Sequence, residues 1–312
     1  MTRVTTRIRA TVGAVDWAWR SALSRGLSFE PTPRGRAFAR DSVGPYCLNF
    51  TAKTNQPDES RLLPADVAQL ALGWWERASA GEEGATLRFL ATAERLLADA
   101  HRYGSALFWP YDVPVPKYGL RPPWHSALAQ GQAASVFVRA AQATAEERYA
   151  DAAVAAIAPL LEPGELLAIT DAGPILQEAP SSPPSHILNG WVQALWGLRD
   201  VAVGLDVPAA EHAWTSGVET LARVLDAYDV GWWTRYSLYP HALADLAKPI
   251  YQRLHVDLVD VLHEQTGMAE FGTVAAKWRR YDRLAARWAA VAHKAAFVAL
   301  DARRRRREAM RG

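Results

Sequence analysis

SALAQGQAASVFVRAAQATAEERYADAAVAAIAPL, residues 126–160, has the pattern of two successive helices with no strand between them. Ser126 is a good N-cap and predicts a helix from there to about Ala143. Thr144-Ala-Glu-Glu147 is a capping-box pattern and predicts the start of the next helix. That second helix ends before Glu162-Pro-Gly164. The stretch therefore indicates helices joined in pairs.

The same organisation extends along the chain in both directions. Further helices are predicted from Pro64 and over residues 84–102, 186–203, 208–227, 248–265 and 270–300. Loops at 104–124, 163–185 and 228–239, rich in Pro, Gly, Ser or aromatic residues, separate the pairs. No strand–helix alternation is visible, which excludes an α/β sheet, and no repeat of about 34 or 40 residues indicates a common solenoid. We expect an all-α fold, an incomplete α/α toroid or barrel of paired helices, whose loops gather at one end and line a cleft.

The two ends of the chain differ from this helical part. Residues 1–60 are predicted to form an N-terminal arm with little β structure, one or two strands near Gly44–Phe50. Residues 61–300 would be the helical domain and 301–312 a basic tail. The run Arg303–Arg307 is most simply a solvated tail, with weak contact at an anionic membrane surface as the alternative.

Composition excludes several classes of protein. Half of the 312 residues are hydrophobic and 22% are charged, which excludes a disordered, collagen-like or coiled-coil chain. A net charge of +2 gives no indication of nucleic-acid binding. Cys47 is the only cysteine, so no internal disulfide or cysteine-based zinc site is expected. No apolar run approaches the roughly 20 residues of a membrane span, and no secretory signal is visible. We therefore expect a cytoplasmic protein, which could form a homodimer.

The helix that follows Pro249 separates two kinds of side chain. With about 100° per residue, Tyr251 and His255 share an inner face with Leu258 and Leu262. The opposite, solvent-facing side holds charged residues, namely Arg253, Asp257, Asp260 and Glu264. Tyr and His at this spacing can act on one ligand. They can equally be satisfied core residues, and the spacing leaves both interpretations open.

Two loops carry further candidates. Glu178 lies among prolines, where a carboxylate could act as a general base or be an exposed loop charge. The loop after residue 228 supplies aromatic rings and one arginine, a combination that suits an acidic sugar but also fits a structural loop; these residues are Trp232, Trp233, Arg235, Tyr236 and Tyr239. Thirteen tryptophans allow the same two interpretations, sugar binding or a Trp-rich core. Nucleotide-binding, serine-hydrolase and helical zinc motifs are absent, and no metal site is expected.

Five ordered motifs together resemble one known family. They are Pro122-Pro-Trp124-His-Ser126-Ala-Leu-Ala-Gln130-Gly-Gln132, then Glu178-Ala-Pro180 with His186-Ile-Leu-Asn189-Gly190, then Tyr228-Asp-Val-Gly231, Tyr236-Ser-Leu238 and Tyr251-Gln-Arg-Leu-His255. Their order and spacing are similar to the C-terminal helical domain of D-glucuronyl C5-epimerases over about residues 60–285. That family inverts C5 of glucuronic acid within a polymer such as heparosan, giving iduronic acid.

The resemblance implies an isomerase that needs no cofactor and acts on an acidic glycan. It assigns catalytic roles to Glu178, Tyr236 and Tyr251. The expected substrate-binding residues are His255, Arg235, Trp124, His125, Gln130, Asn189, Trp233 and Tyr239. A polysaccharide lyase, which shares proton abstraction at C5, and a degenerate glycan-binding domain remain as alternatives.

Three departures from the family pattern predict either a different substrate or reduced activity. Ala179 stands where the family usually has Tyr, Tyr239-Pro-His241 replaces a stretch that usually carries Arg, and only a 60-residue arm precedes the helices. Arg235, Lys248 or Arg253 could replace the missing cation, although Arg253 falls on the solvent face of its helix.

Overall fold

A computed structural model describes residues 62–79 and 81–309. Helices account for 63% of the described residues and strands for 9%, which confirms the all-α prediction. The expected N-terminal arm lies outside the described residues. The helices are α4 (Pro64–Ser79), α5 (Ala85–Ala98), α6 (Ala127–Thr144), α7 (Glu147–Ile157), α8 (Leu188–Leu205), α9 (Pro208–Val224), α10 (Pro249–Thr266), α11 (Ala269–Arg279) and α12 (Leu284–Ala309).

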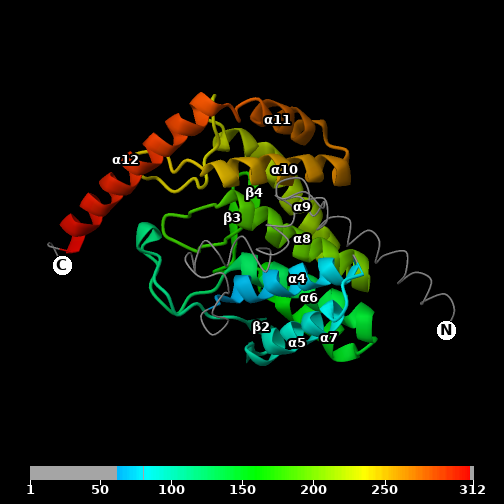
Figure 1. Ribbon diagram of the computed structural model, residues 1–312. Coiled ribbons are helices and arrows are strands. Elements are labelled where there is room, and N and C mark those ends of the chain that lie inside the picture. Colours follow the sequence, from blue (N-terminus) through cyan, green and yellow to red (C-terminus); the bar gives the residue numbers. More distant parts are fainter. Residues whose placement is uncertain (1–61, 80, 310–312) are drawn as a thin grey trace.

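The helices form an open arc of antiparallel pairs (Figure 1). Helices α4, α6, α8 and α10 lie side by side as an inner row, while α5, α7, α9 and α11 each pack against the preceding inner helix. Every residue of α6 from Ala127 to Ala140 is buried, as expected for a helix covered on all sides. Among the described helices, α4 and α10 end the row without an extensive contact with each other, so the ring is incomplete.

Two glycines bring the inner helices α6 and α8 unusually close together. A Cβ atom on Gly131 would lie 2.6 Å from the Ala194 Cα, and one on Gly197 would overlap the Gly131 backbone. Only glycine permits this approach of two helix backbones. The same pair of helices is joined by a fully buried ion pair, in which Arg139 donates to Asp200 at 2.7 Å.

Several local predictions were wrong in detail. The capping box does not form, because Ala145 adopts a left-handed conformation (φ 58°) and Thr144 Oγ1 instead accepts from the Glu146 amide at 3.2 Å. The predicted helix 270–300 is two helices, α11 and α12, and α12 continues to Ala309. The predicted helix 84–102 ends at Ala98, and its last residues form β1 (His101–Tyr103), which pairs with β2 (Ala106–Phe108) in the first loop. The second loop contains another hairpin, β3 (Leu167–Thr170) with β4 (Gly173–Leu176).

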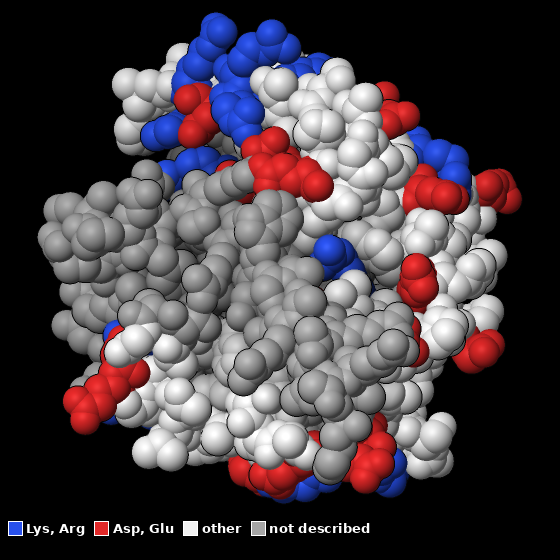
Figure 2. Space-filling view, turned by 90° about the vertical axis from the view of Figure 1, so that its right-hand side faces the viewer, with Lys and Arg blue, Asp and Glu red and all other residues white. Residues whose placement is uncertain are grey.

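Charged side chains of both signs are spread over the face shown in Figure 2, in line with the small net charge. Basic side chains gather most densely at the top of that view, the end of the molecule where Figure 1 shows α11 and the start of α12. On α10 the predicted charged solvent face is only partly correct, because Asp257 is buried. No described helix is both long and apolar enough to span a membrane.

Candidate active site

The ends of the inner helices and the loops between them surround a cavity of about 680 Å³. The start of α4 contributes Asp66, the first loop contributes Lys117, and the start of α8 contributes Asn189. Glu178, Tyr236 and Tyr251, which come from three separate segments, line this one cavity. The structure thus brings the three residues with expected catalytic roles together.

Glu178 is held against the first turn of α8. It accepts hydrogen bonds from the Gly190 amide and, at 3.3 Å, from Asn189 Nδ2. Gly190 leaves the space for this carboxylate, since a Cβ there would lie 2.5 Å from the Glu178 Cβ and closer still to Oε2. Burial raises the pKa of Glu178 to about 7, although the Lys117 ammonium and these hydrogen bonds act in the opposite direction. Near neutral pH the carboxyl can therefore both accept and release a proton.

Tyr236 and Tyr251 extend this contact into a chain of hydrogen bonds. Their rings meet edge to face with centroids 5.0 Å apart, and their hydroxyls are hydrogen-bonded to each other. An ionised carboxylate only accepts, so Tyr236 donates to Glu178 and its oxygen accepts from Tyr251. Burial raises the pKa of both phenols well above the ordinary value, so both remain protonated at neutral pH.

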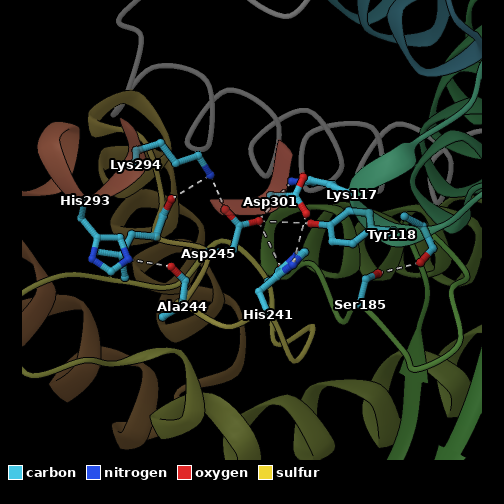
Figure 3. A network of polar contacts seen from close by, with 12 residues as sticks. Lys117, Tyr118, Ser185, His241, Ala244, Asp245, His293, Lys294 and Asp301 are labelled. Carbon is cyan, nitrogen blue, oxygen red and sulfur yellow. Dashed lines mark hydrogen bonds and ion pairs between the residues drawn. The ribbon is translucent and has the colours of Figure 1, made fainter. Parts of the chain in front are cut away.

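Lys117 supplies the cation at this site. Its Nζ lies 4.7 Å from the centre of the Tyr236 ring and 4.4 Å from that of Tyr118. It donates to Asp245 Oδ2 at 3.1 Å, and Figure 3 shows Asp245 between this lysine and Lys294 of α12. Burial alone would raise the pKa of Asp245, but the two ammonium groups outweigh it and hold that pKa below its usual range. Burial lowers the pKa of Lys117, and Asp245 opposes this shift.

Two of the expected substrate-binding residues line the cavity, Trp124 and Asn189. Trp124 stacks on Tyr111 with ring centroids 4.3 Å apart, and its indole donates to the Val113 carbonyl. Its position is thus fixed before any ligand binds.

The other expected substrate-binding residues do not line this cavity. His125 is bonded to Glu165, at 2.9 Å from Nδ1 to Oε2. The Gln130 amide donates to two carbonyls in the core, and the Trp233 indole donates to the Ala247 carbonyl. Tyr239 packs behind Tyr118. Arg235 follows the buried Thr234. Neither Arg235 nor Arg253 lines this cavity.

His255 is separated from Tyr251 by one helical turn and lies in the core. The hydroxyl of Thr234 donates to Gln252 Oε1 at 2.7 Å, so at its 3.0 Å contact with His255 it must accept, and Nδ1 carries the ring proton. The Nε2 atom is buried and, within residues 62–79 and 81–309, has no hydrogen-bond partner. Burial lowers the pKa of His255 to about 3, so the ring is neutral.

Sequence reasoning missed Lys117 and its partners Asp245 and Lys294. The length and the aromatic residues of the first loop did predict a functional segment, but its lysine was not among the candidate residues. Asp66 was missed as well; burial raises the pKa of this carboxyl to about 6, and it lines the cavity from α4. Among the described residues, no group of three or more His, Cys, Asp or Glu side chains is arranged to hold a metal ion.

Comparison with known proteins identifies the class of this domain. The family model for the D-glucuronyl C5-epimerase C-terminus matches residues 103–280, more than half of the chain. The chain is 30% identical over 202 residues to a D-glucuronyl C5-epimerase of Caenorhabditis elegans, an alignment that covers 55% of this chain and 31% of the relative. It is 28% identical over 180 residues to an uncharacterised protein of Methanocaldococcus jannaschii, covering 55% of this chain and 57% of that one.

The chain therefore belongs to the family defined by the D-glucuronyl C5-epimerase C-terminal domain. Its relation to these proteins supports an epimerase-like role in general terms. The aligned part spans about a third of the nematode enzyme and rather more than half of the archaeal protein.

Proposed function

We propose that this protein inverts C5 of D-glucuronic acid residues within an acidic polysaccharide, giving L-iduronic acid residues. The observation that carries the proposal is the hydrogen-bonded chain of Glu178, Tyr236 and Tyr251, with Lys117 beside it, in one cavity. The family membership supports the same kind of chemistry.

The reaction breaks the C5–H bond and forms a new one on the opposite face of the ring. The electron pair left by the departing proton moves into the adjacent carboxylate, which becomes an enediolate with a second negative charge. Stabilising this charge is the main electrostatic task of the enzyme. The Lys117 ammonium can pair with the substrate carboxylate and becomes more favourable as the charge grows, so it favours the transition state over the ground state.

In the proposed mechanism Glu178 takes the C5 proton and Tyr251 returns a proton to the other face. A carboxyl with a pKa of about 7 suits the base, because about half of it is ionised near neutral pH. Tyr251 suits the acid, because its raised pKa keeps the phenol protonated. Tyr236 joins the two groups and lets a proton pass between them after the reaction, which restores the starting state. In the reverse direction the two roles exchange.

Incubation with glucuronate polymers in deuterated water tests the proposal. Heparosan should acquire deuterium at C5, and iduronic acid should appear in the product, both measurable by NMR. Products that absorb in the ultraviolet would instead reveal β-elimination and a polysaccharide lyase. A lack of exchange in every uronate polymer, together with retained binding of glycan, would leave a degenerate binding domain.

The substitution of Ala179 and Tyr239 for the usual family residues supports a substrate that differs in detail from heparosan. Heparosan is therefore a first test polymer in this proposal, and other uronate polymers belong in the same screen. Contact of the Arg303–Arg307 run with an anionic membrane surface, a homodimer and a cytoplasmic location stay predictions.

A further inference from the structure

A second cavity, of about 340 Å³, adjoins the first at Lys117, Tyr236 and Tyr251, which line both. Lys248 lines it from the N-cap of α10, and α12 closes it with Lys294, Phe297, Val298 and Asp301. Three of the chain's lysines, from three separate segments, therefore face one small space next to the candidate catalytic residues.

The charges around this second cavity favour an anion. A single buried carboxylate, Asp245, serves both Lys117 and Lys294. Lys248 is exposed and has no ion pair among the described residues. Asp301 is itself paired with Arg304 at 3.0 Å, so it offsets little of this positive charge. The first turn of α10 also has no side-chain cap, and its dipole adds to the attraction for a negative group.

The helix that closes this cavity lies outside the part of the chain that matches the family. The family match ends at residue 280, whereas α12 begins at Leu284. Lys294 and the other cavity residues of α12 are thus features of this chain that the family match does not account for. Figure 3 shows that Lys294 reaches back from α12 to Asp245 and so ties this helix to the site.

We propose that the second cavity binds an anionic group, a carboxylate or a sulfate, of another sugar unit of the same polysaccharide chain. This inference rests on the proposed function and adds that the protein binds a chain of acidic sugars more tightly than a single sugar. Phe297 and Val298 provide apolar surface for the sugar ring, while Lys248 and Lys294 pair with its charge.

Calorimetric titration of the full chain tests this assignment directly. The ligands are an unsulfated heparosan tetrasaccharide, its N-sulfated form, its carboxyl-reduced form and the methyl glycoside of glucuronic acid. Lys248→Gln should weaken tetrasaccharide binding about tenfold, the effect of one charge-assisted hydrogen bond, and leave the monosaccharide affinity unchanged. Carboxyl reduction also removes the carboxylate of the reacting unit, so its effect on tetrasaccharide affinity is compared between the wild type and Lys248→Gln; a smaller effect in Lys248→Gln assigns a carboxylate to the second cavity. A gain on N-sulfation that Lys248→Gln removes assigns the anion to sulfate, and equal affinities for both forms assign it to carboxylate.

A second variant and a matched control make the result decisive. Val298→Asp adds a negative charge to the same cavity without removing a partner of Asp245, and should weaken tetrasaccharide binding more than Lys248→Gln. Arg102→Gln removes one exposed positive charge on β1, away from both cavities, and should change nothing. Unchanged tetrasaccharide affinity in both cavity variants, or no binding by the wild type, would overturn the inference.

The failure of this inference and of the proposed function give different results. C5 exchange that persists while tetrasaccharide binding is independent of Lys248 and Val298 refutes only the second site. Binding that depends on Lys248 in a protein without C5 exchange refutes only the catalysis.

Discussion

Replacing Gly190 by alanine should remove C5 exchange while leaving most of the fold in place. An alanine Cβ would lie 2.5 Å from the Glu178 Cβ and 2.6 Å from its Cδ. The Cβ is bonded directly to the backbone of Glu178, so rotation of the side chain cannot relieve that contact. Glu178 has to move away from the first turn of α8, and its hydrogen bonds with Gly190 and Asn189 break.

Two opposing effects set the size of the stability change. Alanine is the better helix former by up to about 1 kcal/mol, whereas overpacking typically costs about 1–3 kcal/mol. We expect a net loss of about 0–2 kcal/mol, which corresponds to a drop in melting temperature of at most several degrees. The catalytic effect is much larger, because a displacement of about 1 Å in a reacting group can cost about 10²-fold in rate.

The assay is the rate of deuterium incorporation at C5, measured with the melting temperature on the same sample. Gly217→Ala is the matched control, since it also adds a methyl group to a helical glycine but meets only the flexible end of Leu195, at 2.5 Å. It should melt within a few degrees of the wild type and exchange at the same rate. Wild-type exchange by a folded Gly190→Ala protein would refute the placement of Glu178 as a catalytic group.

Three further predictions concern Tyr251, Glu178 and His255. Tyr251→Phe should lower exchange by about 10²–10⁴-fold with a stability loss of only about 0.5–1.5 kcal/mol, one hydrogen bond; exchange rates and melting curves check both. Because burial raises the pKa of Glu178 to about 7, exchange should rise with pH through about 7, as a pH–rate profile would show. Because the pKa of Glu178 is raised from 4.5 to about 7 on folding, the free energy of unfolding should fall as the pH rises through that range. Urea titrations of Glu178→Gln should show a smaller fall, and the raised pKa of Asp66 accounts for part of the fall that remains. His255→Asn should lower the melting temperature, because His255 bonds Thr234 in the core, but leave the exchange rate of the folded protein close to normal.

Proline and loop composition predicted the helical pairs well because they act locally. Helices α4, α9 and α10 begin at Pro64, Pro208 and Pro249, as expected for a residue that has no amide hydrogen to leave unpaired. Caps were predicted less well, because a capping side chain has tertiary alternatives. Ser126 does precede α6, yet its hydroxyl bonds Tyr111 and makes no cap.

The site was harder to predict because whether a side chain reaches the cavity depends on its position along the helix as well as on the face of the helix that it occupies. The helical wheel placed Tyr251 and His255 on one inner face. Tyr251 lies in the first turn of α10 and reaches the cavity, whereas His255, one turn further on, contacts Thr234 in the core. Glu178, Tyr236 and Tyr251 were selected by resemblance to a family, since the pattern alone left their roles open. Nothing in the local sequence joins Lys117 to Asp245, which is 128 positions away.

Lys117 explains how a buried carboxyl can still serve as a base near neutral pH. Burial disfavours the ionised form of Glu178, and the positive charge of Lys117 is the largest of the effects that oppose it. Lys117→Met removes that charge and keeps most of the side chain's length. The pKa of Glu178 should then rise further, typically by about one unit or more for the loss of a nearby opposite charge. The rising limb of the pH–rate profile should move to higher pH by the same amount, and the maximal rate should also fall because the enediolate loses its cation. A variant that loses rate without any shift of the limb would show that Lys117 acts on the substrate alone and that other groups set the pKa of Glu178.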